Sequence, residues 1–338
     1  MKTIVLNEPE HFVLTDTPEP EAPAPGEALV RVRNIGICGT DLHAFKGKQP
    51  FFDYPRILGH ELGVEVVEVG ENAQGLKPGD KCSVEPYLNC GHCIACRRGK
   101  TNCCTTLKVL GESTDGGMRE YIKMPVHKLH KSDVLGLDQL ALVETLCIGA
   151  HAVRRAQPEA GETALVIGAG PIGLTVIEGL RAITNNIIVM DINEGRLDFC
   201  RRELEISYTV NALDNPLQKL KDLTDGDLPT LVFEATGSAK SMMQSFEYPA
   251  HGSKLVFVGL VQGDLSFNDP EFHRHEMTLM SSRNATAEDF THVIGQLEAG
   301  VIDTRPWITH RAPFEQMIGD FPGWLDPANG VIKAMVEL

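Results

Sequence analysis

Residues 163–173, TALVIGAGPIG, join a short apolar run directly to a glycine-rich turn and the start of a helix-like stretch. Three more apolar runs follow, bounded by glycine or polar residues and separated by helical stretches: NNIIVMD, TLVFEATG and KLVFVGL. Runs that are apolar throughout are typical of strands buried on both faces, as in a parallel sheet covered by helices. The later half of the chain is therefore predicted to be an α/β domain with a doubly wound parallel sheet.

The turn GAGPIG has the G-x-G-x-x-G spacing of a dinucleotide-binding loop. Gly168 would permit the tight turn, and Gly170 would let the backbone approach a pyrophosphate. Gly173 would allow the helix to pack closely on the strand, with the phosphate at the helix N-terminus near Ile172. The alternative is a purely structural glycine turn.

An acidic residue stands where a dinucleotide site needs one. Asp191 ends the run NNIIVMD, 18 residues after Gly173. A carboxylate there accepts hydrogen bonds from the adenosine ribose and repels a 2′-phosphate, which predicts NAD rather than NADP. Arg196 would stack on the adenine or weaken that preference. The predicted cofactor residues are Gly168, Gly170, Ile172, Gly173, Asp191 and Arg196.

The earlier half of the chain has a different pattern. ALVRVRNIGI and GVEVVEVG alternate and KPGDKCSV carries a turn, which predicts β-strands over residues 28–84. The N-terminus has no signal-peptide pattern and no stretch of about 18 apolar residues occurs, so we expect a cytoplasmic protein without a membrane partner. The formal net charge of −15 argues against nucleic-acid binding, because phosphate contacts need clustered Lys and Arg.

Five of the nine cysteines fall in residues 89–104, NCGHCIACRRGKTNCC. In a reducing compartment such spacing favours a metal over disulfides or chance clustering. Four thiolates close a tetrahedron and leave no position for a substrate, so the predicted zinc is structural. Cys103 is expected to be a small buried residue beside the site. The predicted ligands are Cys90, Cys93, Cys96 and Cys104.

A second group of metal-ligating residues lies outside this loop. GICGTDLH contains Cys38, Thr40 and His43, and LGHELG contains His60 and Glu61. From spacing alone, a core cysteine and a buried structural histidine are as acceptable as a metal site.

Six motifs in order make the chain resemble the zinc-dependent medium-chain dehydrogenases over nearly its whole length. They are GICGTDLH, LGHELG, the cysteine loop, GGMREY, VETLCIGAH and VIGAGPIG. The resemblance implies a GroES-like β-barrel catalytic domain over residues 1–146, completed by 285–338, with a Rossmann NAD-binding domain over 147–284. It also implies a homodimer or homotetramer. Within the family the chain is similar to the polyol branch, with sorbitol and threonine dehydrogenases.

The resemblance also implies a catalytic zinc, and so two zinc ions per chain. Cys38, His60 and Glu61 would hold it, and Glu144 would bind it directly or through a water. Thr145 stands where the family usually has proline. Such a zinc acidifies a bound alcohol. Thr40 would take the alcohol proton and pass it through the cofactor ribose to His43, and Asp41 would orient His60. The alternatives are a capping hydroxyl for Thr40 and a surface imidazole for His43.

Two local stretches, GKQPFFDYPRILGHE and DPEFHRHEMTLMSSRNATAEDF, resemble the branch of L-galactonate oxidoreductases. By this resemblance Arg283 would bind a substrate carboxylate, and Phe51 and Phe52 would line the pocket. An ion pair at a domain or subunit junction is the alternative for Arg283.

The sequence thus predicts an NAD-dependent zinc enzyme that interconverts a secondary alcohol of a sugar acid or polyol with its ketone. Two other classes remain. A non-enzymatic zinc- and dinucleotide-binding module would lose the ligands of the open zinc site, whereas a zinc-free NADPH-linked reductase would lack both ligand sets. A sorbitol- or threonine-type dehydrogenase is the alternative within the family.

Overall fold

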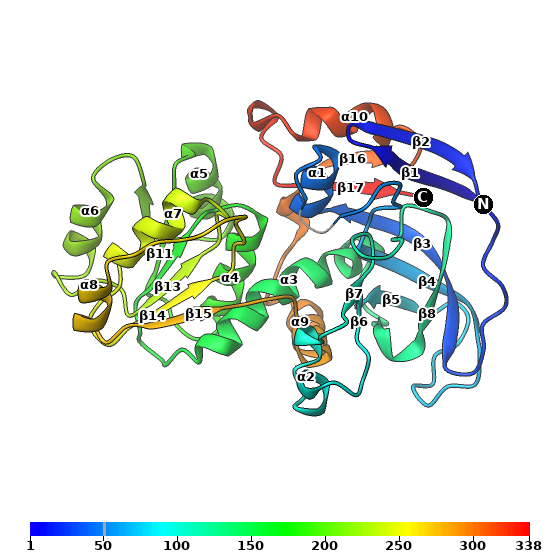
Figure 1. Ribbon diagram of the computed structural model, residues 1–338, viewed down its shortest axis with the longest axis horizontal. Helices are drawn as coiled ribbons and strands as arrows, with labels where there is room; N and C mark the ends of the chain where they lie inside the picture. Colours follow the sequence, from blue (N-terminus) through cyan, green and yellow to red (C-terminus); the bar gives the residue numbers. More distant parts are fainter. Residues whose placement is uncertain (50–51) are drawn as a thin grey trace. The chain divides into compact units, whose positions relative to one another are not determined.

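A computed structural model describes residues 1–49 and 52–338 and divides them into two compact units (Figure 1). The first unit comprises 1–145 and 285–338, and the second comprises 146–284. The helix α3, Leu137–Ala156, contributes residues to both. Across the described residues, no helix combines the length and apolar character needed to span a membrane.

The first unit is built on a seven-stranded sheet with the order β16-β17-β3-β4-β5-β9, in which β8 also pairs with β3. Its central strand β3 is long because EALVRVRNIGI alternates apolar and polar residues along most of its length. Its further helices and strands are β1 Lys2–Glu8, β2 His11–Asp16, β3 Glu27–Ile37, α1 Gly39–Phe45, β4 Glu61–Val69, β5 Lys81–Val84, β6 Tyr87–Leu88, α2 Ile94–Arg97, β7 Lys108–Val109, β8 Tyr121–Pro125, β9 Leu129–Lys131, α9 Ala287–Glu298, β16 Ile308–Pro313, α10 Met317–Trp324 and β17 Lys333–Glu337.

The C-terminal strand completes this sheet. β17 pairs antiparallel with β3, so that Ala334 lies opposite Ile37 and Met335 lies opposite Gly36. The end of the chain therefore packs directly beside the segment that leads into Cys38.

The second unit contains a six-stranded parallel sheet with the order β12-β11-β10-β13-β14-β15 (Figure 1). This is the strand order of the dinucleotide-binding doubly wound fold, which confirms the predicted fold class. Its elements are β10 Ala164–Ile167, α4 Pro171–Arg181, β11 Ile187–Asp191, α5 Glu194–Glu203, β12 Tyr208–Asn211, α6 Pro216–Leu223, β13 Leu231–Glu234, α7 Ala239–Gln244, β14 Lys254–Phe257, α8 Asp269–Arg274 and β15 Thr278–Ser281.

The turn between β10 and α4 requires two of its glycines. Gly168 has φ +98°, a left-handed conformation that disfavours residues with a Cβ. A Cβ on Gly173 would lie 1.7 Å from the carbonyl oxygen of Gly168, so any side chain there would push α4 away from β10. The close contact of helix and strand predicted from GAGPIG is therefore present.

A buried charged group stabilises the first unit. Glu85 accepts hydrogen bonds from Lys128 and from Nε2 of His130 (3.1 Å), and the His130 ring stacks on Phe290 of α9 at 4.6 Å. Burial alone would raise the pKa of Glu85, but the hydrogen bond from His130 and the charge of Lys128 outweigh it and lower the pKa. The ionised carboxylate is thus the form that stabilises the fold.

We expect a Glu85→Gln variant to be less stable at pH 7 by about 2 kcal/mol, because the buried ammonium group of Lys128 loses its charged partner. Since the folded pKa of Glu85 lies below its ordinary value of 4.5, ionised Glu85 adds stability above pH 4.5 that is lost as the pH falls through the folded pKa. The free energy of unfolding, measured from pH 7 to a pH below the folded pKa of Glu85, should therefore fall more for the unsubstituted protein than for the variant. An equal loss in both proteins would contradict this, and the exposed Glu203→Gln serves as control.

Candidate active site and metal centres

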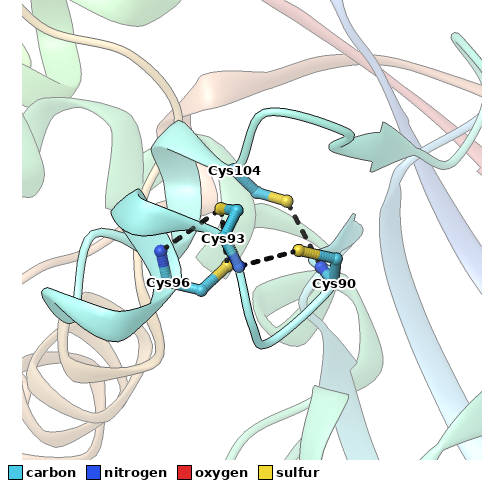
Figure 2. Close-up of side chains that lie close together, drawn as sticks. All are labelled: Cys90, Cys93, Cys96 and Cys104. Atoms are coloured by element: carbon cyan, nitrogen blue, oxygen red, sulfur yellow. Dashed lines mark hydrogen bonds between the residues drawn. The ribbon is translucent and has the colours of Figure 1, made fainter.

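The four predicted cysteines of the loop converge on one point (Figure 2). Their sulfur atoms all lie within 4.8 Å of one another. Backbone N–H groups donate to three of them: from Cys93 to Cys90 (3.4 Å), from Cys90 to Cys104 (3.3 Å) and from Cys96 to Cys93 (3.5 Å). Such N–H···S bonds stabilise thiolates, the form in which cysteine binds a metal.

Two of the four thiols are more acidic than usual, which fits a cation at this point, whereas burial raises the pKa of Cys96 to about 11. The backbone N–H of Cys96 lowers the pKa of Cys93 to about 5, and the N–H of Cys90 lowers the pKa of Cys104. The loop therefore supplies the closed, sulfur-only donor set that structural zinc prefers. The prediction for Cys103 is wrong: its side chain is exposed, because the short 3-10 turn Thr101–Cys103 directs Cys104 inward instead.

A second donor cluster forms where β3 leads into α1 and where β4 begins. Donor atoms of Cys38, His60 and Glu61 lie within 4.8 Å of one another, whereas Glu144 is not part of this trio. Cys38 is the N-cap of α1, and His60 directly precedes β4. Two loops from the ends of paired strands therefore bring together residues more than twenty positions apart in the sequence.

Thr40 and Asp41 support His60 in different ways. Oγ1 of Thr40 lies 3.4 Å from Nε2 of His60. Asp41 accepts hydrogen bonds from the N–H groups of Cys38 (2.9 Å) and Gly59 (3.4 Å), so it joins the two segments that carry the donors. Its Oδ1 lies 3.8 Å from Nδ1 of His60, which is an ionic contact rather than a hydrogen bond.

A buried lysine, not anticipated from the sequence, neutralises Glu61. Nζ of Lys333 lies 2.6 and 2.7 Å from the two carboxylate oxygens and also contacts the Thr145 hydroxyl (3.4 Å). Glu61 is 0% and Lys333 1% exposed. Burial opposes both charges, but Lys333 lowers the pKa of Glu61 and Glu61 raises that of Lys333. The pair is therefore ionised.

Glu144 lies on α3 in the first unit and is buried. Its Oε1 accepts a hydrogen bond from the hydroxyl of Tyr87. Burial raises the pKa of Glu144, and the charge of Glu61 raises it further, while His60 and the Tyr87 hydroxyl lower it. Tyr87 is a second residue of the site that the sequence motifs did not reveal.

The residues present fit a divalent cation. Around this trio lie the buried carboxyl groups of Asp41 and Glu144, and Lys333 is paired with Glu61. Nδ1 of His60 is buried and has no hydrogen-bond partner among the described residues. Burial alone would lower the pKa of His60, but Asp41 and Cys38 raise it well above its ordinary value. A buried imidazole surrounded by a thiol and buried carboxyl groups is the environment that a metal ion stabilises.

In the second unit, the predicted cofactor residues lie together at the carboxyl ends of β10 and β11. Asp191 accepts hydrogen bonds from the N–H groups of Ala169 (2.7 Å) and Asn193 (2.8 Å). Gly170 is the N-cap of α4, and no side chain of the described residues caps it. The guanidinium of Arg196 lies 3.4 Å from the point where a Cβ of Gly170 would stand, and half-buried Ile172 lies in the first turn of α4.

The remaining predicted residues are more exposed. His43 lies in the last turn of α1 and is exposed. Arg283 follows β15 in the second unit and is also exposed, and its relation to the cluster around Cys38 stays a prediction. Phe52 is half-buried and packs edge-on to Tyr54 at 4.9 Å. Phe51 lies outside the described residues.

Comparison with known proteins gives the family. Residues 24–134 match the alcohol dehydrogenase GroES-like domain, and residues 171–299 match the zinc-binding dehydrogenase domain. The chain is 41% identical to the L-galactonate-5-dehydrogenase of Escherichia coli K12 over 316 residues, which cover 93% of this chain and 92% of the relative. The chain belongs to the zinc-type alcohol dehydrogenase family. It is an oxidoreductase that acts on the CH–OH group of a small molecule.

Two further proteins support this zinc-type dehydrogenase assignment. The sorbitol dehydrogenase of Bacillus subtilis 168 is 28% identical over 344 residues, covering 99% of this chain and 97% of the relative. A crystal structure of the alcohol dehydrogenase rspB from E. coli CFT073 in complex with NADH has a TM-score of 0.92 and 30% identity, and the match covers 100% of this chain and 99% of that one. The family confirms the sequence's expectation of a zinc- and NAD-linked oxidoreductase.

Proposed function

We propose that this zinc-type dehydrogenase interconverts a secondary alcohol of a sugar acid, or a related polyol, with its ketone, using NAD and two zinc ions per chain. The first unit would be the catalytic domain, 1–146 with 285–338, and the second the NAD-binding domain, 147–284. The observation that carries this proposal is the cluster of half-buried Cys38 with buried His60 and Glu61, beside the hydroxyl of Thr40. The polyol alternative is supported by the similarity to a sorbitol dehydrogenase.

In the first unit, some residues would bind the catalytic metal and others would transfer the proton. Cys38 and His60 would hold the catalytic zinc, with Glu61 and Glu144 supplying carboxylate oxygens directly or through water. A zinc ion with an open position, when bound, lowers the pKa of an alcohol and so favours loss of its hydroxyl proton. Oγ1 of Thr40 would accept that proton. His43, exposed one turn further along α1, would exchange it with solvent.

The loop cysteines would hold the second zinc, which has no reacting role. Their four sulfur atoms satisfy a tetrahedral ion completely. The metal would stabilise a loop in which the short helix α2 has no buried residue, and which therefore has little apolar core of its own.

In the second unit, the turn at Gly168 and the N-terminus of α4 would bind the pyrophosphate of NAD. The helix begins at Pro171 after an uncapped Gly170, which leaves backbone N–H groups for a phosphate. The Asp191 carboxylate would accept hydrogen bonds from the hydroxyls of the adenosine ribose, and the Arg196 guanidinium would stack on the adenine. NADP would bind less well, since the Asp191 carboxylate repels a 2′-phosphate.

For the substrate, we favour a sugar acid with Arg283 as the carboxylate-binding residue. The L-galactonate-5-dehydrogenase relative acts, by its name, on such an acid. A net charge of −15 makes a local cation necessary for an anionic substrate, and a guanidinium binds a carboxylate with two parallel hydrogen bonds.

The substrate proposal is tested with a series of aldonates and neutral polyols, following the absorbance of reduced nicotinamide. Arg283→Ala should raise KM for the best aldonate roughly 10- to 100-fold, the effect of losing a charged hydrogen bond, and leave polyol turnover unchanged. Arg283→Lys should lose less, and Arg202→Ala, on the exposed face of α5, should change nothing. Unaltered aldonate kinetics in Arg283→Ala would exclude Arg283 as the carboxylate-binding residue.

We also propose a cytoplasmic homodimer or homotetramer that binds neither nucleic acid nor membranes. None of the nine cysteines, all of which lie in the described residues, is joined to another by a disulfide bond, which is usual in a reducing compartment. Strand β15 lies at the edge of the six-stranded sheet, and Leu279 in it is 39% exposed, which supports strand pairing with a second copy.

A further inference from the structure

Tyr87 lies at the base of the four-cysteine loop, three residues before Cys90. Its side chain is only 3% exposed, and its hydroxyl donates to Oε1 of Glu144 on α3, fifty-seven residues later. The sequence motifs did not include it, and the assignment of metal ligands does not use it. The hydrogen bond between the buried Tyr87 hydroxyl and the buried Glu144 carboxylate therefore has no role among those described so far.

The backbone around Tyr87 is fixed by the ribbon that closes the cysteine loop. β6 and β7 pair antiparallel, with Tyr87 opposite Val109 and Leu88 opposite Lys108. The N–H of Leu110 also donates to the carbonyl of Pro86 (3.1 Å). Tyr87 consequently has little freedom to follow Glu144, so the hydrogen bond fixes the carboxylate rather than the phenol.

The hydrogen bond makes the two oxygens of Glu144 unequal. Oε1 is engaged by Tyr87. Glu61, the other candidate carboxylate, already accepts from Lys333 at both oxygens. Lys333 therefore occupies both oxygens of Glu61, whereas Tyr87 occupies only Oε1 of Glu144 and leaves Oε2 to a different partner.

We propose that Tyr87 is a positioning residue for Glu144, which holds Oε1 so that Oε2 binds the catalytic metal. This inference rests on the proposed function, because it assumes a metal between Cys38 and His60. Without the phenol, Glu144 is free to rotate or to bind through both oxygens, and the coordination of the metal changes. A partner that orients a metal ligand typically changes metal affinity or activity by 10- to 100-fold when it is removed.

The test uses Tyr87→Phe, which removes only the hydroxyl, in the full-length protein loaded with Co²⁺. The difference spectrum between each protein and its Cys38→Ser counterpart isolates the cobalt of the second centre from that of the four-cysteine loop. We expect the visible bands of this centre to shift, its Co²⁺ affinity to fall roughly 10- to 100-fold, and kcat to fall by a similar factor. KM for NAD and the thermal midpoint should stay close to those of the unsubstituted protein.

The matched control is Tyr121→Phe, which removes a phenol from half-buried Tyr121 on β8, where the ring packs against Arg31 at 5.9 Å. It should behave as the unsubstituted protein in every measurement. If Tyr87→Phe keeps the same second-centre spectrum and affinity, the positioning role is excluded while the proposed function stands. If no cobalt signal in the unsubstituted protein depends on Cys38, the proposed function itself fails.

Discussion

Replacing Cys38 with serine should lower kcat/KM by roughly 10³-fold or more, because the several kcal/mol of transition-state stabilisation that a catalytic metal supplies depend on retaining that metal. Cys38 contributes the thiol of the cluster with His60 and Glu61, and a serine hydroxyl is a far weaker zinc ligand than a thiolate. The kinetics are measured with NAD and the best substrate of the aldonate and polyol series.

The same variant should bind NAD with unchanged affinity, within about twofold, since the predicted cofactor residues belong to the second unit. Titration of NAD by fluorescence or calorimetry checks this. Cys103→Ser is the matched control, because Cys103 is exposed and outside both donor clusters, and it should keep full activity. Full turnover in Cys38→Ser would mean that the reaction does not take place at this cluster.

Lys333→Met should destabilise the zinc-depleted protein by about 3–5 kcal/mol, the cost of leaving one member of a buried ion pair without its partner. Methionine has a similar length but no charge, so Glu61 would remain buried beside Glu144 and Asp41 without its ion-pair partner. Chemical denaturation in excess chelator, with both proteins prepared alike, measures the loss. Zinc should restore part of the stability, because the ion replaces the missing positive charge.

Lys333→Arg separates charge from packing. It keeps the positive charge and should lose much less stability than the methionine variant, although its planar group is larger. If Lys333→Met were as stable as the unsubstituted protein in chelator, Glu61 would not carry a charge in the fold. The buried negative charge that a metal ion would have to balance at this site would then be smaller than we propose.

The Rossmann half of the fold follows from local sequence because each strand is buried on both faces. TALVI and NNIIVMD contain the apolar runs ALVI and IIVM, and the structure places β10 and β11 there with every residue of both strands buried. The hairpin of β1 and β2 was not predicted, because its turn uses Glu10 at φ +65° rather than a glycine. Helix α3 was recognised only as the motif VETLCIGAH, since its residues are apolar on too many sides to show a clear period.

The candidate site was likewise predictable where its residues lie in local motifs and not where they depend on contacts between distant segments. The donors of GICGTDLH and LGHELG could be identified because the chemistry and the order of motifs are local. Lys333 could not, because a lysine in the strand VIKAMVEL is expected to be exposed, and only the pairing of β17 with β3 brings it to Glu61. The contact of Tyr87 with Glu144 was also missed, since it joins a two-residue strand to a distant helix.

The most direct test of the account is the zinc content per chain of the unsubstituted protein and of Cys38→Ser, measured by mass spectrometry after exhaustive dialysis. Four cysteine sulfurs in one cluster and a thiol, an imidazole and a carboxylate in the other predict two zinc ions in the unsubstituted protein. The serine variant should retain one. A single zinc ion in both proteins would contradict the claim that the reaction depends on a second metal centre.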